Sequence, residues 1–375
     1  MSGAIVTEKK KKRGSGNPPG RASALSSDQK LEEGDTVVNL LHGLRSEIGE
    51  ENALILGDNK LVMKIRGVVS TRIPSLDLAI GRGGIPLGRL TILYGKEGSG
   101  KTTVALQIVS ECQSMGGYAV YFDCEYKLDP DYAEKLGVDT KRLIISQPSS
   151  LEDVIKGIHK IIDFKAELRK RTGKSKPCVI ILDSINACKS KESLEREVGE
   201  KNYPPEARIW SEQLSNICAK ASREDVALLF ISQIRAKIGV VYGDAEEIAG
   251  GNAPKYHASL VMRIVRVGSE IEDGTKVANK IEAECRKNQI APPFKKGEFL
   301  IRYGVGADFE RSLLLQATEL GTITKKGNKY FWKDQELGLG VKEASKFLKE
   351  NPEYRDKLNK IFRKKMGWVY VDAPS

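Results

Sequence analysis

The chain has 375 residues, of which 61 are basic and 50 acidic, giving a formal net charge of +11 at pH 7. This length allows a full hydrophobic core and more than one domain. The sequence has no apolar run long enough to span a bilayer and no apolar core of a secretory signal at its N-terminus, which predicts a soluble, cytoplasmic protein.

Charge and cysteine usage narrow the class further. A basic surplus favours nucleic acid or an anionic membrane as a partner, although a solvated basic surface has the same composition. The six cysteines form no C-x-x-C pair, which predicts reduced, buried thiols rather than a disulfide framework. The three histidines are scattered and indicate no metal site.

Residues 1–30 predict a disordered basic arm. They are polar and rich in Gly, Pro and Ser, with the run Lys9–Arg13, and cannot bury enough apolar surface to offset chain entropy. The arm either contacts nucleic-acid phosphates or only adds solubility.

Residues 31–66 predict a small helix and strand that dock on another copy of the chain. Asp35 is a candidate helix cap, Gly49 a candidate helix end, and Ala53–Leu56 a candidate strand. Five apolar residues recur at helical spacing: Val37, Leu40, Leu41, Leu44 and Ile48.

Residues 67–305 alternate strands and helices, which predicts an α/β core with a twisted, mostly parallel sheet. The first strands are apolar throughout, as parallel strands buried on both faces are, and are expected at Leu90–Tyr94, Tyr118–Asp123, Cys178–Leu182 and Ala227–Ile231. Later strands follow without long helices between them and predict an antiparallel extension near Ser259–Val267, Lys280–Arg286 and Glu298–Tyr303.

Residues 95–102 read G-x-x-x-x-G-K-T, the phosphate-binding P-loop. The preceding strand and the following helical run Thr103–Val109 favour this motif over a chance glycine-rich turn. Lys101 is predicted to reach the β- and γ-phosphates and the Thr102 hydroxyl to ligate Mg²⁺. The predicted ATP-binding residues here are Gly95, Lys96, Glu97, Gly98, Ser99, Gly100, Lys101, Thr102 and Thr103.

Two further apolar strands end in acids. Asp183 follows one of them and is predicted to hold Mg²⁺ through its water shell. Asp123 and Glu125 follow the other, and one of the pair is a candidate to orient or deprotonate the water that attacks ATP. The alternative is that Asp123 or Glu125 merely caps the next turn. Glu125 is the favoured candidate.

Gln233 ends another strand with an uncharged amide and is predicted to sense the nucleotide. Its amide can donate to a γ-phosphate and loses that contact after hydrolysis. The following segment, Arg235 to Gly251, is long and rich in glycine, as functional loops often are. A sensor at the base of this loop would link nucleotide state to loop conformation.

Residues 306–375 predict a small α+β domain with a basic surface. A helix is expected near Arg311–Leu320, a hairpin around Tyr330–Trp332, and two amphipathic helices after it.

Together these motifs resemble the bacterial RecA-type homologous recombinases, as a divergent or phage-borne member. The similarity runs from about residue 50 to about residue 365, and the motifs are family-specific in combination. The matching segments are Ser75–Ile80, Gly84–Arg89, Gly95–Thr103, Asp123–Pro130, Gln233–Gly239, Gly250–Lys255 and Lys287–Lys295.

The resemblance implies a P-loop ATPase of RecA-like fold that forms helical filaments on single-stranded DNA and exchanges strands with duplex DNA. It implies that Glu125 activates water, that Gln233 couples the γ-phosphate to a DNA loop, and that Lys287 reaches a neighbour's phosphates. Asp129 and Tyr132 match positions that contact the adenine.

The resemblance also implies two DNA loops, at about 195–207 and about 234–248. Taken alone, Tyr203 and Ile238 could equally be core residues, and Arg235 and Lys237 solvated loop charges. The implied DNA-binding residues are Tyr203, Arg208, Arg235, Lys237, Ile238, Gly239, Gly250, Gly251 and Asn252.

Some residues depart from the family pattern. Gln289 stands where a second phosphate-reaching lysine is expected, and a neutral amide cannot supply that charge. Pro204 and Pro205 stiffen the first DNA loop. Tyr126 replaces a histidine and Ser215 an arginine, and the family's acidic C-terminal tail is missing from this sequence.

Alternative functions share the same nucleotide site. One is a related DNA-dependent ATPase, either a helicase or a recombination-accessory protein, and another is a DNA-binding filament that uses ATP as a switch with weak hydrolysis. A small-molecule kinase would not need the glycine-rich loop.

Overall fold

A computed structural model of the protein describes residues 27–50, 53, 55, 65–196, 205–236, 246–248 and 250–368. The chain divides into two units, residues 1–61 and 62–375. None of the helices in these described ranges combines the length and the apolarity needed to cross a lipid bilayer.

The described part of the first unit is mainly one helix, α1 (Ser27–Ile48). The helix begins eight residues before Asp35, so the prediction that Asp35 caps it is wrong, and the last four residues of the predicted disordered arm are helical. Gly49 ends it as expected, with φ +95° and its amide donating to the Arg45 carbonyl. Ala53 and Ile55 lie in no strand, which contradicts the strand predicted there.

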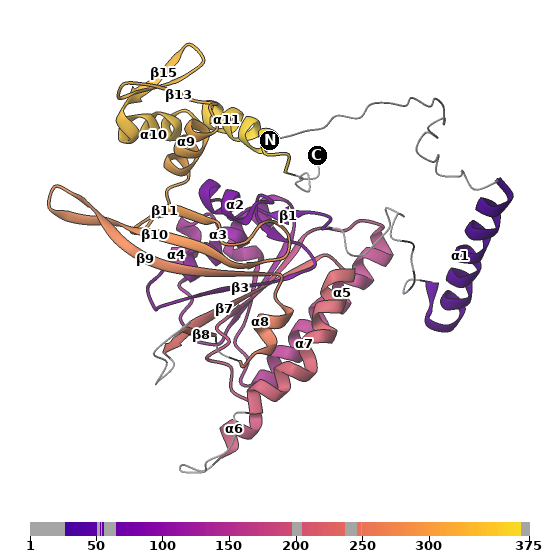
Figure 1. The fold of residues 1–375 in the computed structure, drawn as a ribbon. Coiled ribbons are helices and arrows are strands. Elements are labelled where there is room, and N and C mark those ends of the chain that lie inside the picture. Colours follow the sequence, from indigo (N-terminus) through magenta and orange to yellow (C-terminus); the bar gives the residue numbers. More distant parts are fainter. Residues whose placement is uncertain are drawn as a thin grey trace, which may run out of the picture. The chain divides into compact units, whose positions relative to one another are not determined.

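The second unit is built on a ten-stranded sheet (Figure 1). Its main strand order is β12-β11-β10-β9-β3-β7-β6-β4-β5, and β8 pairs with β7. The strands from β9 to β5 in this order are parallel, and β9 through β12 pair antiparallel, as predicted. The bounds are β3 (Leu90–Gly95), β4 (Tyr118–Asp123), β5 (Leu143–Ser146), β6 (Cys178–Asp183), β7 (Val226–Ala236), β8 (Glu246–Ile248), β9 (Leu260–Glu272), β10 (Thr275–Asn288), β11 (Lys296–Arg302) and β12 (Gly306–Ala307).

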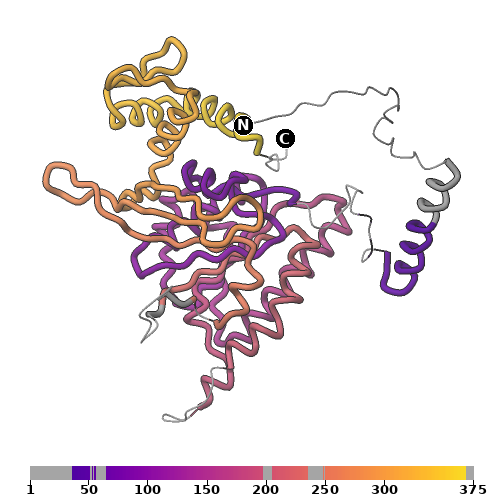
Figure 2. The backbone as a smooth tube through the Cα atoms, in the orientation of Figure 1, coloured from indigo at the N-terminus to yellow at the C-terminus, as the bar shows by residue number. Residues whose placement is uncertain are grey.

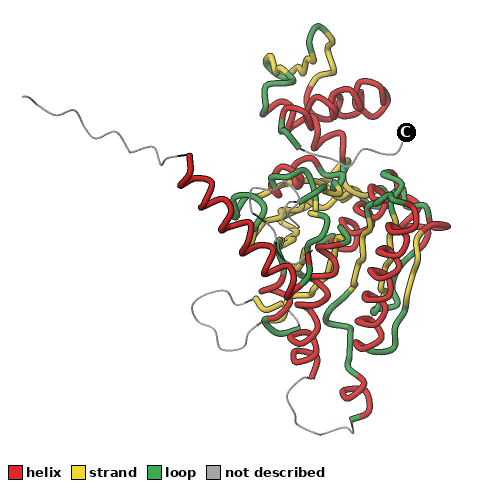
Figure 3. The backbone as a smooth tube through the Cα atoms, turned by 90° about the vertical axis from the view of Figure 1, so that its right-hand side faces the viewer, coloured by secondary structure: helices red, strands yellow, loops and turns green. Residues whose placement is uncertain are grey.

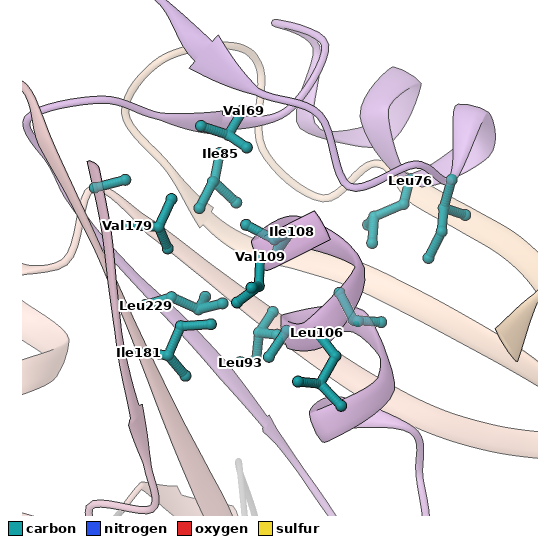
Figure 4. Packing of buried hydrophobic residues seen from close by; sticks show 14 of the residues in the cluster. Val69, Leu76, Ile85, Leu93, Leu106, Ile108, Val109, Val179, Ile181 and Leu229 are labelled. Carbon is teal, nitrogen blue, oxygen red and sulfur yellow. The ribbon is translucent and has the colours of Figure 1, made fainter. Parts of the chain in front are cut away.

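Helices cover both faces of this sheet (Figure 3), because its strands are apolar on both sides. On one face, Leu106, Ile108 and Val109 of α3 point toward strand residues such as Leu93 and Ile181 (Figure 4). On the other face, α5 and α7 pack through side chains such as Ile158 and Trp210. The helices are α2 (Pro74–Ile80), α3 (Lys101–Ser114), α4 (Pro130–Lys135), α5 (Leu151–Thr172), α6 (Lys191–Glu195), α7 (Pro205–Arg223) and α8 (Ala253–His257), with the 3₁₀ turn η2 (Thr140–Arg142).

Strands β9 and β10 form a long hairpin, seen at the left of the tube in Figure 2. They run for 13 and 14 residues, longer than the periodicity predicts. A separate two-stranded ladder, β1 (Val68–Val69) with β2 (Ile85–Pro86), lies before β3 in the chain.

The C-terminal segment has its own small core around Trp332, Leu348 and Phe362. The hairpin predicted at Tyr330–Trp332 is part of a three-stranded antiparallel sheet. The strands are β13 (Thr324–Lys326), β14 (Lys329–Trp332) and β15 (Gln335–Leu339), and the helices are α9 (Phe309–Glu319), α10 (Gly340–Glu350) and α11 (Pro352–Lys365).

Candidate active site

A cavity of about 440 Å³ lies at the carboxyl ends of β3, β4, β6 and β7. Parallel strands direct their carboxyl ends to one edge of a sheet, where ligands of open α/β folds bind. The P-loop, the two acid-bearing turns and Gln233 all contribute to its wall.

The P-loop connects β3 to α3, and its lysine is held at the base of the cavity. Lys101 is 7% exposed, and its ammonium donates to the carbonyls of Gly95 at 3.0 Å and Lys96 at 2.8 Å. Burial lowers the pKa of Lys101, while the charges of Asp183, Glu125 and Glu97 oppose that shift. The Ser99 hydroxyl is buried without a hydrogen-bond partner in the described part of the chain.

The two predicted magnesium residues face each other. The Thr102 hydroxyl donates to Asp183 Oδ2 at 2.9 Å, and the Tyr121 hydroxyl donates to the same oxygen at 2.6 Å. Burial raises the pKa of Asp183, and these two hydrogen bonds oppose that shift. A hydroxyl and a carboxylate are the hard oxygen ligands that Mg²⁺ takes, so these residues fit the ion.

Asp123 and Glu125 make different contacts in the structure. Asp123 accepts hydrogen bonds from the backbone amides of Lys127 and Leu128, both at 3.2 Å, and so caps the turn. Glu125 instead faces the cavity, where its Oε1 accepts from Ser184 at 2.6 Å and from the Gln233 amide at 3.0 Å. Within the turn, whose residues the structure describes, Glu125 accepts no backbone amide and contacts only the exposed Lys127 ammonium, at 3.2 Å.

Gln233 is held by a residue that sequence reasoning missed. Asn186 lies on the loop after β6. Its side-chain oxygen accepts from the backbone N–H of Gln233 at 2.8 Å, and its side-chain nitrogen donates to the backbone carbonyl of Gln233 at 3.3 Å. It also accepts from the Ser232 hydroxyl at 3.1 Å. These contacts fix the backbone of Gln233 independently of its side chain.

Residues of α4 and of the antiparallel extension also line the cavity. Tyr132 lines the cavity and shares a hydrogen bond with Thr103, whereas the Asp129 carboxylate caps α4. Asn279, Arg302 and Tyr303 line the cavity too, although no local motif marks them. They are brought there only by the pairing of β10 with β11.

Lys287 lies apart from the cavity, at the end of β10. Its ammonium donates to the carbonyls of Lys255 at 3.0 Å and Tyr256 at 2.8 Å. Burial and the charge of Lys255 lower the pKa of Lys287. Gln289 is exposed two residues later.

Only part of the predicted DNA site can be placed. Tyr203, Lys237, Ile238 and Gly239 lie outside the described residues. Arg208 is on α7, 71% exposed, and 3.9 Å from Glu192. Arg235 lies on β7 opposite Glu247 of β8.

The backbone conformation and close packing after β8 explain why glycine occupies positions 250 and 251. Gly250 and Gly251 both have positive φ, and a Cβ at Gly250 would lie about 3 Å from Ile185 and Trp210. Asn252 follows them and precedes α8. The backbone at Gly250 therefore packs closely against Ile185 and Trp210 of the core.

Comparison with known proteins gives matches over nearly the whole chain. The family model of the RecA N-terminal domain matches residues 36–308, and that of the RecA C-terminal domain matches residues 312–367. The protein named Protein RecA from Aquifex aeolicus is 40% identical over 293 residues, covering 78% of this chain and 82% of that protein. Protein RecA from Psychrobacter arcticus is 37% identical, covering 86% and 89%, and that from Kineococcus radiotolerans is 37% identical, covering 89% and 93%.

Proposed function

This chain belongs to the RecA family of recombinases, and we propose that it uses ATP to assemble into helical filaments on single-stranded DNA. In these filaments it pairs the bound strand with homologous duplex DNA and exchanges strands, in the cytoplasm. The single observation that carries the proposal is the contact of Gln233 with Glu125 at 3.0 Å, because it joins the ATP site to the strand that leads to the DNA loop.

Each residue of the site has one part in hydrolysis. The P-loop amides and Lys101 bind the phosphates. Thr102 and Asp183 would hold Mg²⁺, and the ion would neutralise charge that develops on the phosphate oxygens. Glu125 orients the attacking water and accepts its proton. Ser184 donates to the same carboxylate and fixes the direction in which it points.

Gln233 transmits the state of the nucleotide. With a γ-phosphate present, its amide turns from Glu125 to the phosphate, and the change passes along β7 to Arg235 and the DNA loop. Asn186 binds the Gln233 backbone and so links this residue to the loop after β6. Arg208, on α7, contacts DNA phosphates, and Lys287 acts on the nucleotide of the next protomer.

A second candidate is a filament in which ATP acts mainly as an assembly switch. The exposed amide of Gln289 favours it, since that position lacks the charge of a second lysine. The helicase and accessory-ATPase alternatives lose support, because both domain models that match are those of RecA.

The decisive experiment combines microscopy with turnover. We expect electron microscopy with single-stranded DNA and a non-hydrolysable ATP analogue to show regular helical filaments, and Lys101→Ala to form none. An ATPase assay with and without DNA then separates the recombinase from the switch. Isolated particles on DNA with every nucleotide would contradict both.

A further inference from the structure

Two thiols meet beside the candidate active site. The sulfurs of Cys124 and Cys188 lie 3.1 Å apart, although the residues are 64 positions apart in the chain. Both cysteines are free thiols. Neither is used by the mechanism proposed above.

The pair bridges the two turns that carry the predicted acids. Cys124 directly precedes Glu125, and its backbone amide donates to the Asp183 carbonyl at 2.9 Å. The Cys188 thiol donates to the carbonyl of Ser184 at 3.3 Å, and the Ser184 hydroxyl in turn donates to Glu125 at 2.6 Å. Any change in the spacing of the two sulfurs is therefore passed to Glu125 through covalent bonds and short hydrogen bonds.

We propose that Cys124 and Cys188 are a reversible oxidation site, at which peroxide converts the two thiols into a disulfide that slows ATP turnover. The formation of the bond rests on the geometry of the pair, and only its effect on turnover rests on the proposed function. The co-reactant is hydrogen peroxide, and a dithiol reductant restores the thiols.

The chemistry balances in two steps. The Cys124 sulfur attacks one peroxide oxygen, which gives a sulfenic acid and one water. The Cys188 sulfur then attacks the Cys124 sulfur, the S–S bond forms, and the hydroxyl leaves with the Cys188 proton as a second water. The two sulfurs lose two electrons in total, and peroxide gains them.

The order of attack follows from exposure. Cys188 is 5% exposed, whereas Cys124 is only partly buried. The contact with Cys124 and burial raise the pKa of the Cys188 thiol, so Cys188 reacts second, as the resolving thiol.

The disulfide would displace Glu125 but leave the P-loop in place. A disulfide holds its sulfurs about 2.05 Å apart, so the pair must close by roughly 1 Å from its present contact. Misplacement by about 1 Å can cost an enzyme up to about 100-fold in rate. We therefore expect turnover to fall by about 10-fold to about 100-fold on oxidation, with ATP affinity nearly unchanged.

Peptide mapping tests the bond directly. The full-length protein is treated with hydrogen peroxide, remaining thiols are alkylated, and the digest is read by mass spectrometry. A peptide that links Cys124 to Cys188 supports the proposal, and its absence after exhaustive peroxide treatment overturns it. This readout does not depend on whether the reduced protein hydrolyses ATP, so failure of the proposed function is a separate result.

Turnover tests the consequence. We expect peroxide to slow DNA-stimulated hydrolysis by the unmodified protein and dithiothreitol to restore it, while Cys124→Ser and Cys188→Ala stay insensitive. Cys218→Ala, which removes a partly buried cysteine of α7, is the matched control and should respond like the unmodified protein. Equal turnover of the linked and reduced protein would show that the thiols are only packing groups and would overturn the proposal.

Discussion

Glu125 is the side chain on which turnover depends most in the proposed mechanism. We expect Glu125→Gln to bind ATP and DNA normally but to hydrolyse ATP about 100-fold to about 10,000-fold more slowly, because only the proton acceptor is lost. Steady-state hydrolysis with saturating DNA measures this.

Asp123→Asn is the matched comparison for that variant. Its carboxylate accepts two backbone amides of the turn, so we expect it to lower the thermal unfolding midpoint. Normal turnover by Glu125→Gln together with slow turnover by a folded Asp123→Asn would show that Asp123, and not Glu125, activates the water.

Asn186 holds the sensor, and its loss should weaken coupling more than catalysis. Asn186→Ala leaves the Gln233 backbone amide without its side-chain acceptor, which costs about 1 to 3 kcal/mol. We expect the ratio of single-strand affinities with an ATP analogue and with ADP to fall by about tenfold. Fluorescence anisotropy of labelled DNA measures both affinities, and an unchanged ratio would remove Asn186 from the coupling path.

Gly95, the last residue of β3, must be glycine because β9 packs closely against it, and not only because the P-loop backbone wraps around phosphate. A Cβ at Gly95 would lie 2.1 Å from the Ile264 carbonyl oxygen on β9, so Gly95→Ala should cost at least about 1 to 3 kcal/mol. The control is Gly268→Ala on β9, the strand that also carries Ile264. A Cβ at Gly268 would meet only the Lys280 side chain, at 3.6 Å. Denaturant unfolding compares the two, and equal stability would contradict the clash.

Helix α2 carries a buried carboxyl, that of Asp77, which makes the unfolding free energy depend on pH. Burial raises the pKa of Asp77 from 3.8 to about 7, and donors at Ser70 and Thr71 oppose that shift. The folded state therefore keeps a proton that the unfolded chain releases above about pH 4. The protonated Asp77 carboxyl therefore contributes to the unfolding free energy fully below about pH 4, and this contribution is lost as pH rises from about 4 through about 7.

Substitution of Asp77 should flatten that dependence. We expect the unfolding free energy of the unmodified protein to fall between pH 5 and pH 7 more steeply than that of Asp77→Asn, by on the order of 1 kcal/mol per pH unit. Asp334→Asn, on an exposed turn, is the control. Parallel curves for all three proteins would show that Asp77 does not titrate in this range.

Assembly of copies is the level at which α1 is expected to act. Its apolar residues are exposed within its own unit, with Leu40 at 69% and Leu44 at 51%. We expect Leu40→Asp with Leu44→Asp to abolish cooperative binding to single strands while ATP affinity changes less than about twofold, because each apolar side chain is worth about 1.5 to 3 kcal/mol when buried at an interface. The matched control is His42→Asp on the same helix, which removes no apolar side chain.

Binding of single-stranded DNA measured at several protein concentrations gives the cooperativity of each variant. Filaments of normal length from the double variant would exclude α1 from the contact between copies. The basic surplus of the chain adds a second expectation, since binding led by phosphate contacts weakens with salt and is indifferent to sequence.

Local signals account for the parts that sequence reasoning predicted well. The apolar runs of β3, β4 and β6 and the P-loop are each complete within a few residues, so they could be read without knowledge of the fold. The start of α1 was missed because Asp35 also tolerates a helix interior, and the residues before it include good helix formers such as Lys30 and Glu32. The third strand of the C-terminal sheet was missed because Gln335–Leu339 is short and contains only two apolar residues, separated by Gly338.

The sequence by itself determined the family, the nucleotide loop and the alternation of strands and helices, because these depend on residues that are adjacent in the chain. Only the tertiary structure showed that Asp123 accepts the amides of its turn while Glu125 contacts Gln233, added Asn186 and Tyr303, and brought the sulfurs of Cys124 and Cys188 together. The contact of Glu125 with Gln233 joins residues 108 positions apart. Contacts at that separation depend on the order and register of the strands, which no local spacing encodes.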